Sequence, residues 1–224
     1  PLGLGLTGTV LAIATRGDAL FAGGSFTYAG GVEANYVAQW KDNAWSSLAG
    51  GVDNTVTSLA VDSDDLYVGG SFTQAGVYTA NNVAVGGPSY WGLLQPGVTA
   101  GTNGMVYDIA QTPNGVVIGG DFSEAGGSTA NHIVGYTGMQ WDRLDEGIGN
   151  SEFGIVRAVT ANADGEVFAG GSFSSFVNDF SEYPSRIAKY ASNEWSLMGS
   201  GVEGGEYLYV DALEVGPNGE VFVG

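Results

Sequence analysis

Large and small apolar residues alternate along the chain with a short period that predicts β-strands. In five places a Val is followed three residues later by a second aliphatic residue, and in four of these the residue two after the Val is small. The Val positions are Val10, Val56, Val106, Val156 and Val210, and their aliphatic partners are Ile13, Leu59, Ile109, Val159 and Leu213. A strand with large side chains on one face and small ones on the other is packed on both faces. No stretch shows helical periodicity, so we expect each Val to begin the first strand of an all-β unit.

A Gly-Gly-Ser/Asp-Phe motif closes the second predicted strand of each unit and shows that the chain is a repeat. The first glycines are Gly23, Gly69, Gly119 and Gly170, and the terminal VFVG puts Gly224 in the fifth position. An Ala-Asn pair precedes the third strand in three repeats, and a W-x-x-L/M-x-x-G motif marks the fourth strand from Trp45, Trp91, Trp141 and Trp195. Four short antiparallel strands recurring at steps of 46 to 54 residues are typical of the blades of a β-propeller.

These motifs make the chain resemble the kelch-type and Rax2-like superfamily of propeller repeats, over nearly its whole length. The resemblance implies a β-propeller that serves as a binding platform or cell-surface protein, and less often as an enzyme. We expect residues 1–224 to form a single propeller domain, most economically with five blades. In that arrangement Leu2–Leu6 would complete the blade begun by Tyr207–Gly224. The alternative is a fragment of a larger propeller.

The repeated glycines and aromatic residues are expected to have structural roles. Gly-Gly at a strand end suits the close approach of another backbone, and the Phe and Trp residues would fill the space between blades rather than stack on carbohydrate. The Asn of each Ala-Asn pair is expected to cap a turn rather than to bind sugar. The acidic run VDSDD at Val61–Asp65 is interpreted as a turn rather than a calcium loop.

The charge balance excludes some classes of partner. The chain has 24 acidic and 6 basic residues, a net charge of −18, and no Cys. Repulsion makes nucleic acids and anionic membrane surfaces unfavourable partners. No apolar run is long enough to cross a membrane. We expect an extracellular or cell-surface protein whose partner is a protein, a glycan or another copy of itself.

Three aromatic residues in the fourth repeat form the first candidate site. Phe176, Phe180 and Tyr183 lie in a loop that is longer than its counterparts and outside the repeat consensus. Exposed aromatic residues of this kind either fold back onto the edge of their blade or contact a partner. They are the candidate binding residues.

Two carboxylates in the third repeat form a candidate metal site. Asp108 replaces the small residue of the first strand, and Asp121 replaces the Ser after Gly-Gly. A turn centred on Asn114 and Gly115 would place these two side chains opposite each other near the central channel, although a register slip of one residue would separate them. Like charges in that position need compensation, which a bound calcium ion or a shared proton would provide. The alternative is that both simply reach channel water.

The repeat pattern and the acidic composition together predict a non-catalytic binding or structural module without an organic cofactor. No repeated set of polar residues converges on the channel, which argues against catalysis. The alternative is a glycan-active hydrolase or lyase, or a lectin, that uses carboxylates in the channel.

Overall fold

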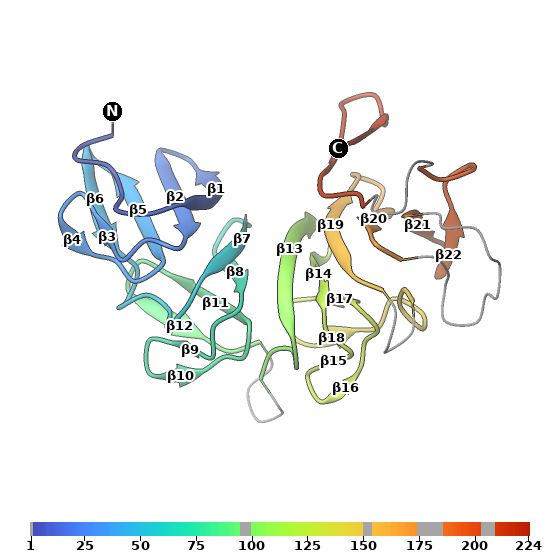
Figure 1. Cartoon of the computed structure of the whole chain (residues 1–224), viewed down its shortest axis with the longest axis horizontal. Helices are drawn as coiled ribbons and strands as arrows, with labels where there is room; N and C mark the ends of the chain where they lie inside the picture. The colour runs from blue at the N-terminus through green and yellow to red at the C-terminus, as the bar shows by residue number, and fades with distance from the viewer. Residues whose placement is uncertain (1, 95–99, 150–153, 174–185, 203–208) are drawn as a thin grey trace.

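The repeats fold into consecutive four-stranded antiparallel sheets, the blades of a β-propeller, which follow one another around an arc (Figure 1). The computed structural model describes residues 2–94, 100–149, 154–173, 186–202 and 209–224. Within these residues there is no helix, and therefore none long and apolar enough to cross a membrane.

Each blade is a meander whose first strand is the innermost. Blade 1 contains β1 (Val10–Arg16), β2 (Ala19–Gly24), β5 (Val37–Lys41) and β6 (Ala44–Ser47), and blade 2 contains β7 (Val56–Val61), β8 (Leu66–Gly70), β11 (Val83–Gly87) and β12 (Tyr90–Gly92). Blade 3 contains β13 (Met105–Thr112), β14 (Gly115–Asp121), β17 (Ile133–Tyr136) and β18 (Trp141–Asp142). Blade 4 contains β19 (Val156–Ala161), β20 (Val167–Gly171), β21 (Ile187–Ala191) and β22 (Glu194–Leu197). The hairpin of β23 (Leu213–Val215) and β24 (Val221–Val223) follows at the C-terminus.

A small hairpin lies between the second and third strands of the first three blades. These hairpins are β3 (Tyr28–Ala29) with β4 (Val32–Glu33), β9 (Gln74–Ala75) with β10 (Tyr78–Thr79), and β15 (Glu124–Ala125) with β16 (Ser128–Thr129). The tail of the preceding fourth strand bridges to each one, as Val52 does to Ala75 and Thr102 to Ala125. Consecutive blades are therefore connected by backbone pairing at this edge as well as by side chains.

A β-bulge explains why the large residues of the inner strands are three apart. In β13 the pairing shifts between Val106, which pairs with Gly120, and Asp108, which pairs with Gly119. The extra residue brings Val106 and Ile109 to the same face, although a regular strand would put them on opposite faces. The same shift occurs in β1, β7 and β19.

The Gly-Gly pairs create the space that these bulged strands fill. A Cβ on Gly69 would lie 2.5 Å from Val106 Cγ1 of the next blade. A Cβ on Gly70 would lie 2.1 Å from the carbonyl oxygen of Thr55 in its own hairpin. The first glycine thus admits the next blade, and the second admits the backbone of its own first strand.

The Phe landmarks are buried inside the fold, as the sequence predicts, and the Trp landmarks are buried or half-buried. The side chains of Phe26, Phe72, Phe122 and Phe173 are buried. The Trp45, Trp91 and Trp195 indoles each donate a hydrogen bond to a carbonyl of the preceding fourth-strand tail, at Leu2, Leu48 and Leu144. These Trp residues therefore hold neighbouring repeats together instead of presenting a flat surface to a sugar.

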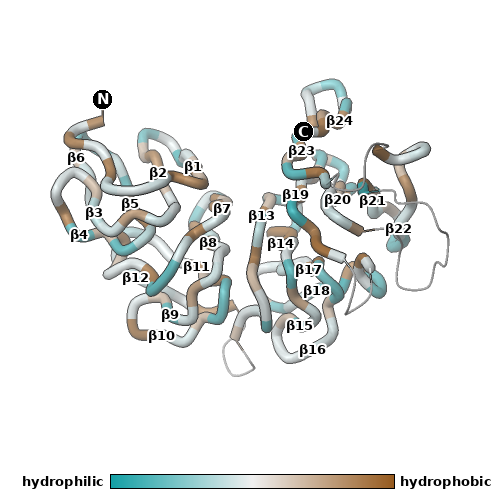
Figure 2. Tube along the Cα trace, viewed as in Figure 1, coloured by the Kyte–Doolittle hydropathy of each residue, from teal (hydrophilic) through white to brown (hydrophobic). Residues whose placement is uncertain are grey.

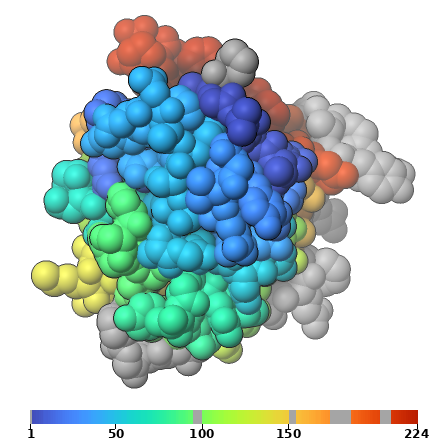
Figure 3. Space-filling view, turned by 90° about the vertical axis from the view of Figure 1, so that its left-hand side faces the viewer, coloured from blue at the N-terminus to red at the C-terminus, as the bar shows by residue number. Residues whose placement is uncertain are grey.

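The N-terminal segment occupies the place of such a tail. Leu6 bridges to Ala29 of blade 1 as Val52 bridges to Ala75 of blade 2. Figure 3 shows these N-terminal residues, dark blue, lying against the surface of blade 1. The hairpin β23–β24 lies at the other end of the arc, beside blade 4 (Figure 1).

Candidate binding site

The predicted pairing of Asp108 with Asp121 is wrong. Asp108 pairs with Gly119, and Asp121 pairs with Met105. The turn is centred one residue earlier than expected, on Pro113 and Asn114, because Thr112 pairs with Gly115, and the bulge shifts the register again. Asp121 is exposed, so the two carboxylates do not form the expected facing pair. Among the described residues, no group of three or more His, Asp or Glu side chains is placed to hold a metal ion.

Asp108 instead connects three blades. One carboxylate oxygen accepts hydrogen bonds from Ser58 Oγ of β7 and from the backbone N–H of Ile109, both at 2.9 Å. The other oxygen accepts the backbone N–H of Val159 in β19, also at 2.9 Å. Desolvation raises the pKa of this carboxyl, and the three hydrogen bonds oppose that rise. These three partners all belong to the inner strands β7, β13 and β19, so Asp108 stabilises the blade junctions.

The other sequence-based site predictions have different outcomes. Phe176, Phe180 and Tyr183 lie outside the described residues. The turn-capping interpretation of the Ala-Asn pairs is confirmed, since the side-chain amides of Asn35, Asn81 and Asn131 donate to carbonyls of Gly50, Ala100 and Glu146 at 2.6 to 3.0 Å. In the VDSDD run, Asp62 Oδ1 accepts the N–H groups of Asp64 and Asp65 at 2.9 and 2.7 Å, as the turn interpretation predicts.

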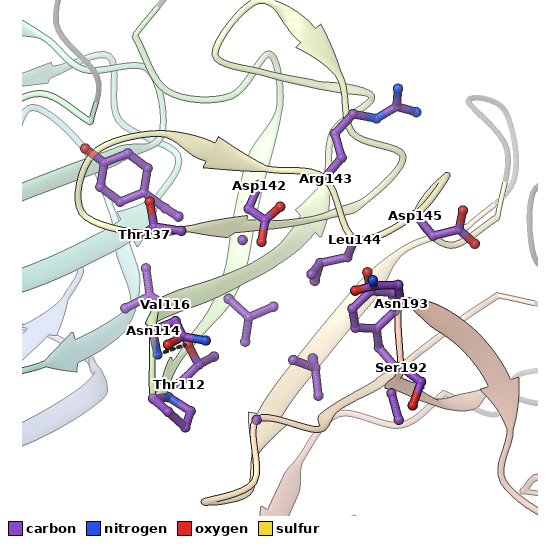
Figure 4. Close-up of a pocket in the computed structure, with 18 residues that line it drawn as sticks. Thr112, Asn114, Val116, Thr137, Asp142, Arg143, Leu144, Asp145, Ser192 and Asn193 are labelled. Carbon is purple, nitrogen blue, oxygen red and sulfur yellow. Dashed lines mark hydrogen bonds between the residues drawn. The ribbon is translucent and has the colours of Figure 1, made fainter.

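A pocket of about 530 Å3 lies between blades 3 and 4, and we call it the inter-blade pocket (Figure 4). Five segments surround it: the β13–β14 turn, the end of β17, the chain from Asp142 to Asp145, the start of β20, and the β21–β22 turn. Its volume is in the range of pockets that bind small ligands. Neither Asp108 nor Asp121 lines it.

The lining combines an apolar floor with hydrogen-bonding groups around it. Val116, Val117, Leu144 and Val167 are buried side chains at the floor. The polar lining residues are Thr112, Asn114, Thr137, Asp142, Arg143, Asp145, Tyr190, Ser192 and Asn193. Figure 4 shows the Asp142 carboxylate directed into the hollow, whereas the Arg143 side chain points away from it. Arg143 forms an ion pair with Glu146 at 2.9 Å.

Tyr190 is the aromatic side chain most affected by the charges of this pocket. Desolvation raises the pKa of its hydroxyl, and the negative charges of Asp142 and Asp145 raise it further. A backbone hydrogen bond from Asp145 opposes the shift. The hydroxyl therefore stays protonated at neutral pH and is available as a hydrogen-bond donor next to two carboxylates.

Sequence reasoning missed this pocket, although one signal for it is present. The third repeat has WDRLDEG where the others have WSSLAGG, WGLLQPG and WSLMGSG, so Asp142 and Asp145 stand at positions that are uncharged elsewhere. These two departures from the repeat pattern mark the side of blade 3 that faces blade 4.

Comparison with known proteins supports the fold and leaves the ligand open. No family model matches the sequence, and no curated protein matches it. Two solved structures are described as the extracellular domain of BT4673 from B. thetaiotaomicron, one as part of a hybrid two-component system and the other as part of a one-component system. Their TM-scores are 0.59 and 0.60 at 14% identity, and the match covers 96% of this chain and 26% of theirs.

The chain thus spans about a quarter of the length of these two neighbours. A WD40 β-propeller domain of Doa1 also matches, but its TM-score of 0.33 is too low to carry an argument. The BT4673 likeness concerns the fold, and the neighbours themselves are extracellular domains.

Proposed function

We propose that this protein is a non-catalytic extracellular binding module and that the inter-blade pocket holds a glycan. The observation that carries the proposal is the pocket itself, in which amide, hydroxyl and carboxylate groups surround an apolar floor. Ligand sites of this kind combine apolar walls with a few placed polar groups. The proposal includes membership of the kelch-type and Rax2-like superfamily, which the repeat motifs support.

The chemistry of the lining favours a polyhydroxylated ligand. The carboxylates of Asp142 and Asp145 accept hydrogen bonds from hydroxyl groups, and the amides of Asn114 and Asn193 can both donate and accept. The apolar floor suits the C–H face of a sugar ring. Because the chain has a net charge of −18, the proposed glycan is neutral or carries amino groups rather than acidic ones.

Two further parts of the proposal follow from the site and the neighbours. No organic cofactor or metal ion is required, since the pocket's own groups provide the hydrogen bonds. The extracellular location is supported by the two BT4673 extracellular domains, which share the fold.

A glycan array followed by calorimetry on the best ligand tests this proposal. Wild type is expected to bind a neutral or amino-containing glycan. Asp142→Asn is expected to weaken binding by about tenfold to a hundredfold, because a charged hydrogen-bond partner contributes about 1.5–3 kcal/mol. The matched control is Asp164→Asn, which removes a carboxylate from an exposed turn of blade 4 outside the pocket.

The control variant should bind as wild type does, and the glycan should be recovered intact. Equal binding by wild type and Asp142→Asn would rule out the inter-blade pocket as the site. Cleavage of the glycan by wild type would instead support the enzyme alternative.

A further inference from the structure

The small hairpins of the first three blades are built alike except at one position. Each has a buried Ala in its first strand, and the residue that pairs with this Ala lies on the same face of the hairpin. The pairs are Ala29 with Val32, Ala75 with Tyr78, and Ala125 with Ser128. Figure 2 shows an apolar position, in brown, beside β10, whereas the chain between β15 and β16 is pale. The third hairpin thus has a small side chain where the first two have larger ones.

The Trp of the outer strand lies directly against these hairpins. A Cβ on Gly76 of the second hairpin would lie 2.9 Å from Trp91 Cδ1, and a Cβ on Gly126 of the third would clash with Trp141. Trp91 is 6% exposed, whereas Trp141 is only half-buried. The indole is therefore buried in blade 2, and part of it is accessible in blade 3, where the hairpin carries Ser128.

A second pocket, of about 350 Å3, lies at this place, and we call it the hairpin pocket. Its lining groups include the hydroxyls of Ser128 and Thr129, the amide of Gln140 and the indole of Trp141. Hydroxyl, amide and apolar groups again occur together, as in the inter-blade pocket and in ligand sites generally. The hairpin pocket therefore has the chemistry of a binding site of its own.

The charge of the hairpin pocket fits the class of ligand proposed above. Arg143 is the only charged residue that lines it within the described part of the chain. Glu146 compensates that charge through an ion pair of 2.9 Å. The pocket thus offers hydrogen bonds to neutral hydroxyl groups and has no unpaired cation that would select an acidic sugar.

The two pockets lie on either side of the same outer strand, β18. Consecutive residues of a strand point to opposite faces, and Trp141 lines the hairpin pocket whereas Asp142 lines the inter-blade pocket. Arg143, the next residue, lines both, and Figure 4 shows its side chain pointing away from the inter-blade pocket. Because β18 is the last strand of its sheet, only this edge strand separates the two pockets.

We propose that the hairpin pocket is a second subsite for the glycan of the inter-blade pocket, so that the ligand is an oligosaccharide that bends around β18. This rests on the proposed function, because it takes the inter-blade pocket as the first subsite. Sugar hydroxyls bond to Ser128, Thr129 and Gln140, and the C–H face of a ring packs on the accessible part of Trp141. Once one subsite is filled, the second contact is intramolecular and raises the affinity.

Calorimetry with glycans of increasing length tests the second subsite. The probes are glucose with its β-1,4-linked oligosaccharides up to the pentasaccharide, and the corresponding series of glucosamine. Both sugars have equatorial substituents and hence an apolar C–H face. In the series that binds, wild type is expected to gain about tenfold or more in affinity from the monosaccharide to the longer members.

Ser128→Tyr gives the third hairpin the side chain of the second and fills the hairpin pocket. It should remove the gain with length, so that oligosaccharides bind about as the monosaccharide does. Ser128→Val introduces the smaller side chain of the first hairpin and should remove part of the gain. Because blades 1 and 2 already carry these side chains, both variants should melt close to wild type.

The matched control is Val32→Tyr, which puts the same side chain at the equivalent position of blade 1, outside both pockets. Its gain with length should equal that of wild type. Asp142→Asn should instead weaken binding of every member of the series, because it acts in the inter-blade pocket.

The indole N–H signal of Trp141 reports on the hairpin pocket directly. It is assigned by its loss from the NMR spectrum of Trp141→Phe. The signal is expected to shift when the pentasaccharide binds and to stay in place when the monosaccharide binds.

The possible failures of the two subsites are distinguishable. Equal affinity for all lengths, an unchanged gain in Ser128→Tyr, or a Trp141 signal that the pentasaccharide does not move would overturn the second subsite and leave the first in place. Equal binding by wild type and Asp142→Asn would overturn the first subsite. Absence of binding in both series would overturn both.

Discussion

Asp108 is the residue at which the third repeat departs most clearly from its neighbours, and it joins three blades. The equivalent residues are Ala12, Ser58, Ala158 and Ala212, which carry no charge. Its carboxylate accepts hydrogen bonds from Ser58 in blade 2 and from Val159 in blade 4. A buried carboxylate in this position gains hydrogen bonds at the cost of desolvation, and desolvation is the largest influence on its pKa. Its role is to stabilise the junctions, and the stabilisation depends on pH.

The pH dependence of this stabilisation has a definite sign. The pKa of Asp108 in the folded protein is raised above the ordinary value of 3.8. Between these two values the folded protein holds a proton that the unfolded chain has released, so stability falls as pH rises through this window. Wild type should therefore gain stability relative to Asp108→Asn as the pH is lowered from neutral toward the ordinary value.

Urea denaturation of both proteins at several pH values measures that difference. Other titrating groups, such as Asp53 and Glu166, are shared by the two proteins and cancel in the comparison. A stability difference that stays constant, or that moves in favour of Asp108→Asn on acidification, would contradict the assignment.

At the scale of the elements, the unit of the fold is the junction between one blade's Gly-Gly and the next blade's bulged strand. The bulge brings Val106 and Ile109 to one face, and Gly69 provides the space they enter. The indole of Trp91 and the tail at Leu48 close the same kind of junction from the outer side, through a 3.1 Å hydrogen bond. Repetition of this unit accounts for the recurring sequence landmarks.

A double-mutant cycle tests this junction. Gly69→Ala should lower the free energy of unfolding by about 1–3 kcal/mol, because the added Cβ meets Val106 at 2.5 Å. In a Val106→Ala background the clash with the Val methyl group is absent, so the same substitution should cost less, with a coupling of about 1 kcal/mol or more.

The matched control for this cycle is Gly224→Ala. It changes the same repeat position where a Cβ meets only Ala212 at 3.6 Å, and its stability should be close to that of wild type. Strictly additive costs for Gly69→Ala and Val106→Ala would show that the two residues do not share a junction.

The sequence predicts the strands and the propeller but does not predict the register of β13 with β14. The strands that contain Val106 and Gly119 are predicted correctly, because equivalent residues recur at the same positions in four or more repeats. The register prediction fails because the turn lies one residue earlier than expected and a bulge follows in β13. Each of them shifts the pairing, and neither has a signal in the spacing of Asp108 and Asp121. The inter-blade pocket is harder still to predict, since it depends on how five segments of two blades meet.

At the scale of the whole molecule, the described blades follow an arc and carry the inter-blade pocket between blades 3 and 4 on a strongly acidic chain. In the described part of the chain Lys41, Arg143, Arg157 and Lys189 form ion pairs with carboxylates. With only 6 basic residues against 24 acidic ones, most carboxylates have no basic residue to pair with. This surface disfavours acidic partners and agrees with a neutral or amino-containing glycan as the proposed ligand.

The measurement that tests the central proposal most directly is an NMR titration of the labelled protein with the best-binding glycan of the array. The account predicts that the largest shifts of backbone amide signals fall at residues 142–145 and 190–193, around the inter-blade pocket, and that the glycan signals show no cleavage products. Shifts confined to the inner strands around Asp108, or the appearance of cleaved glycan, would contradict it.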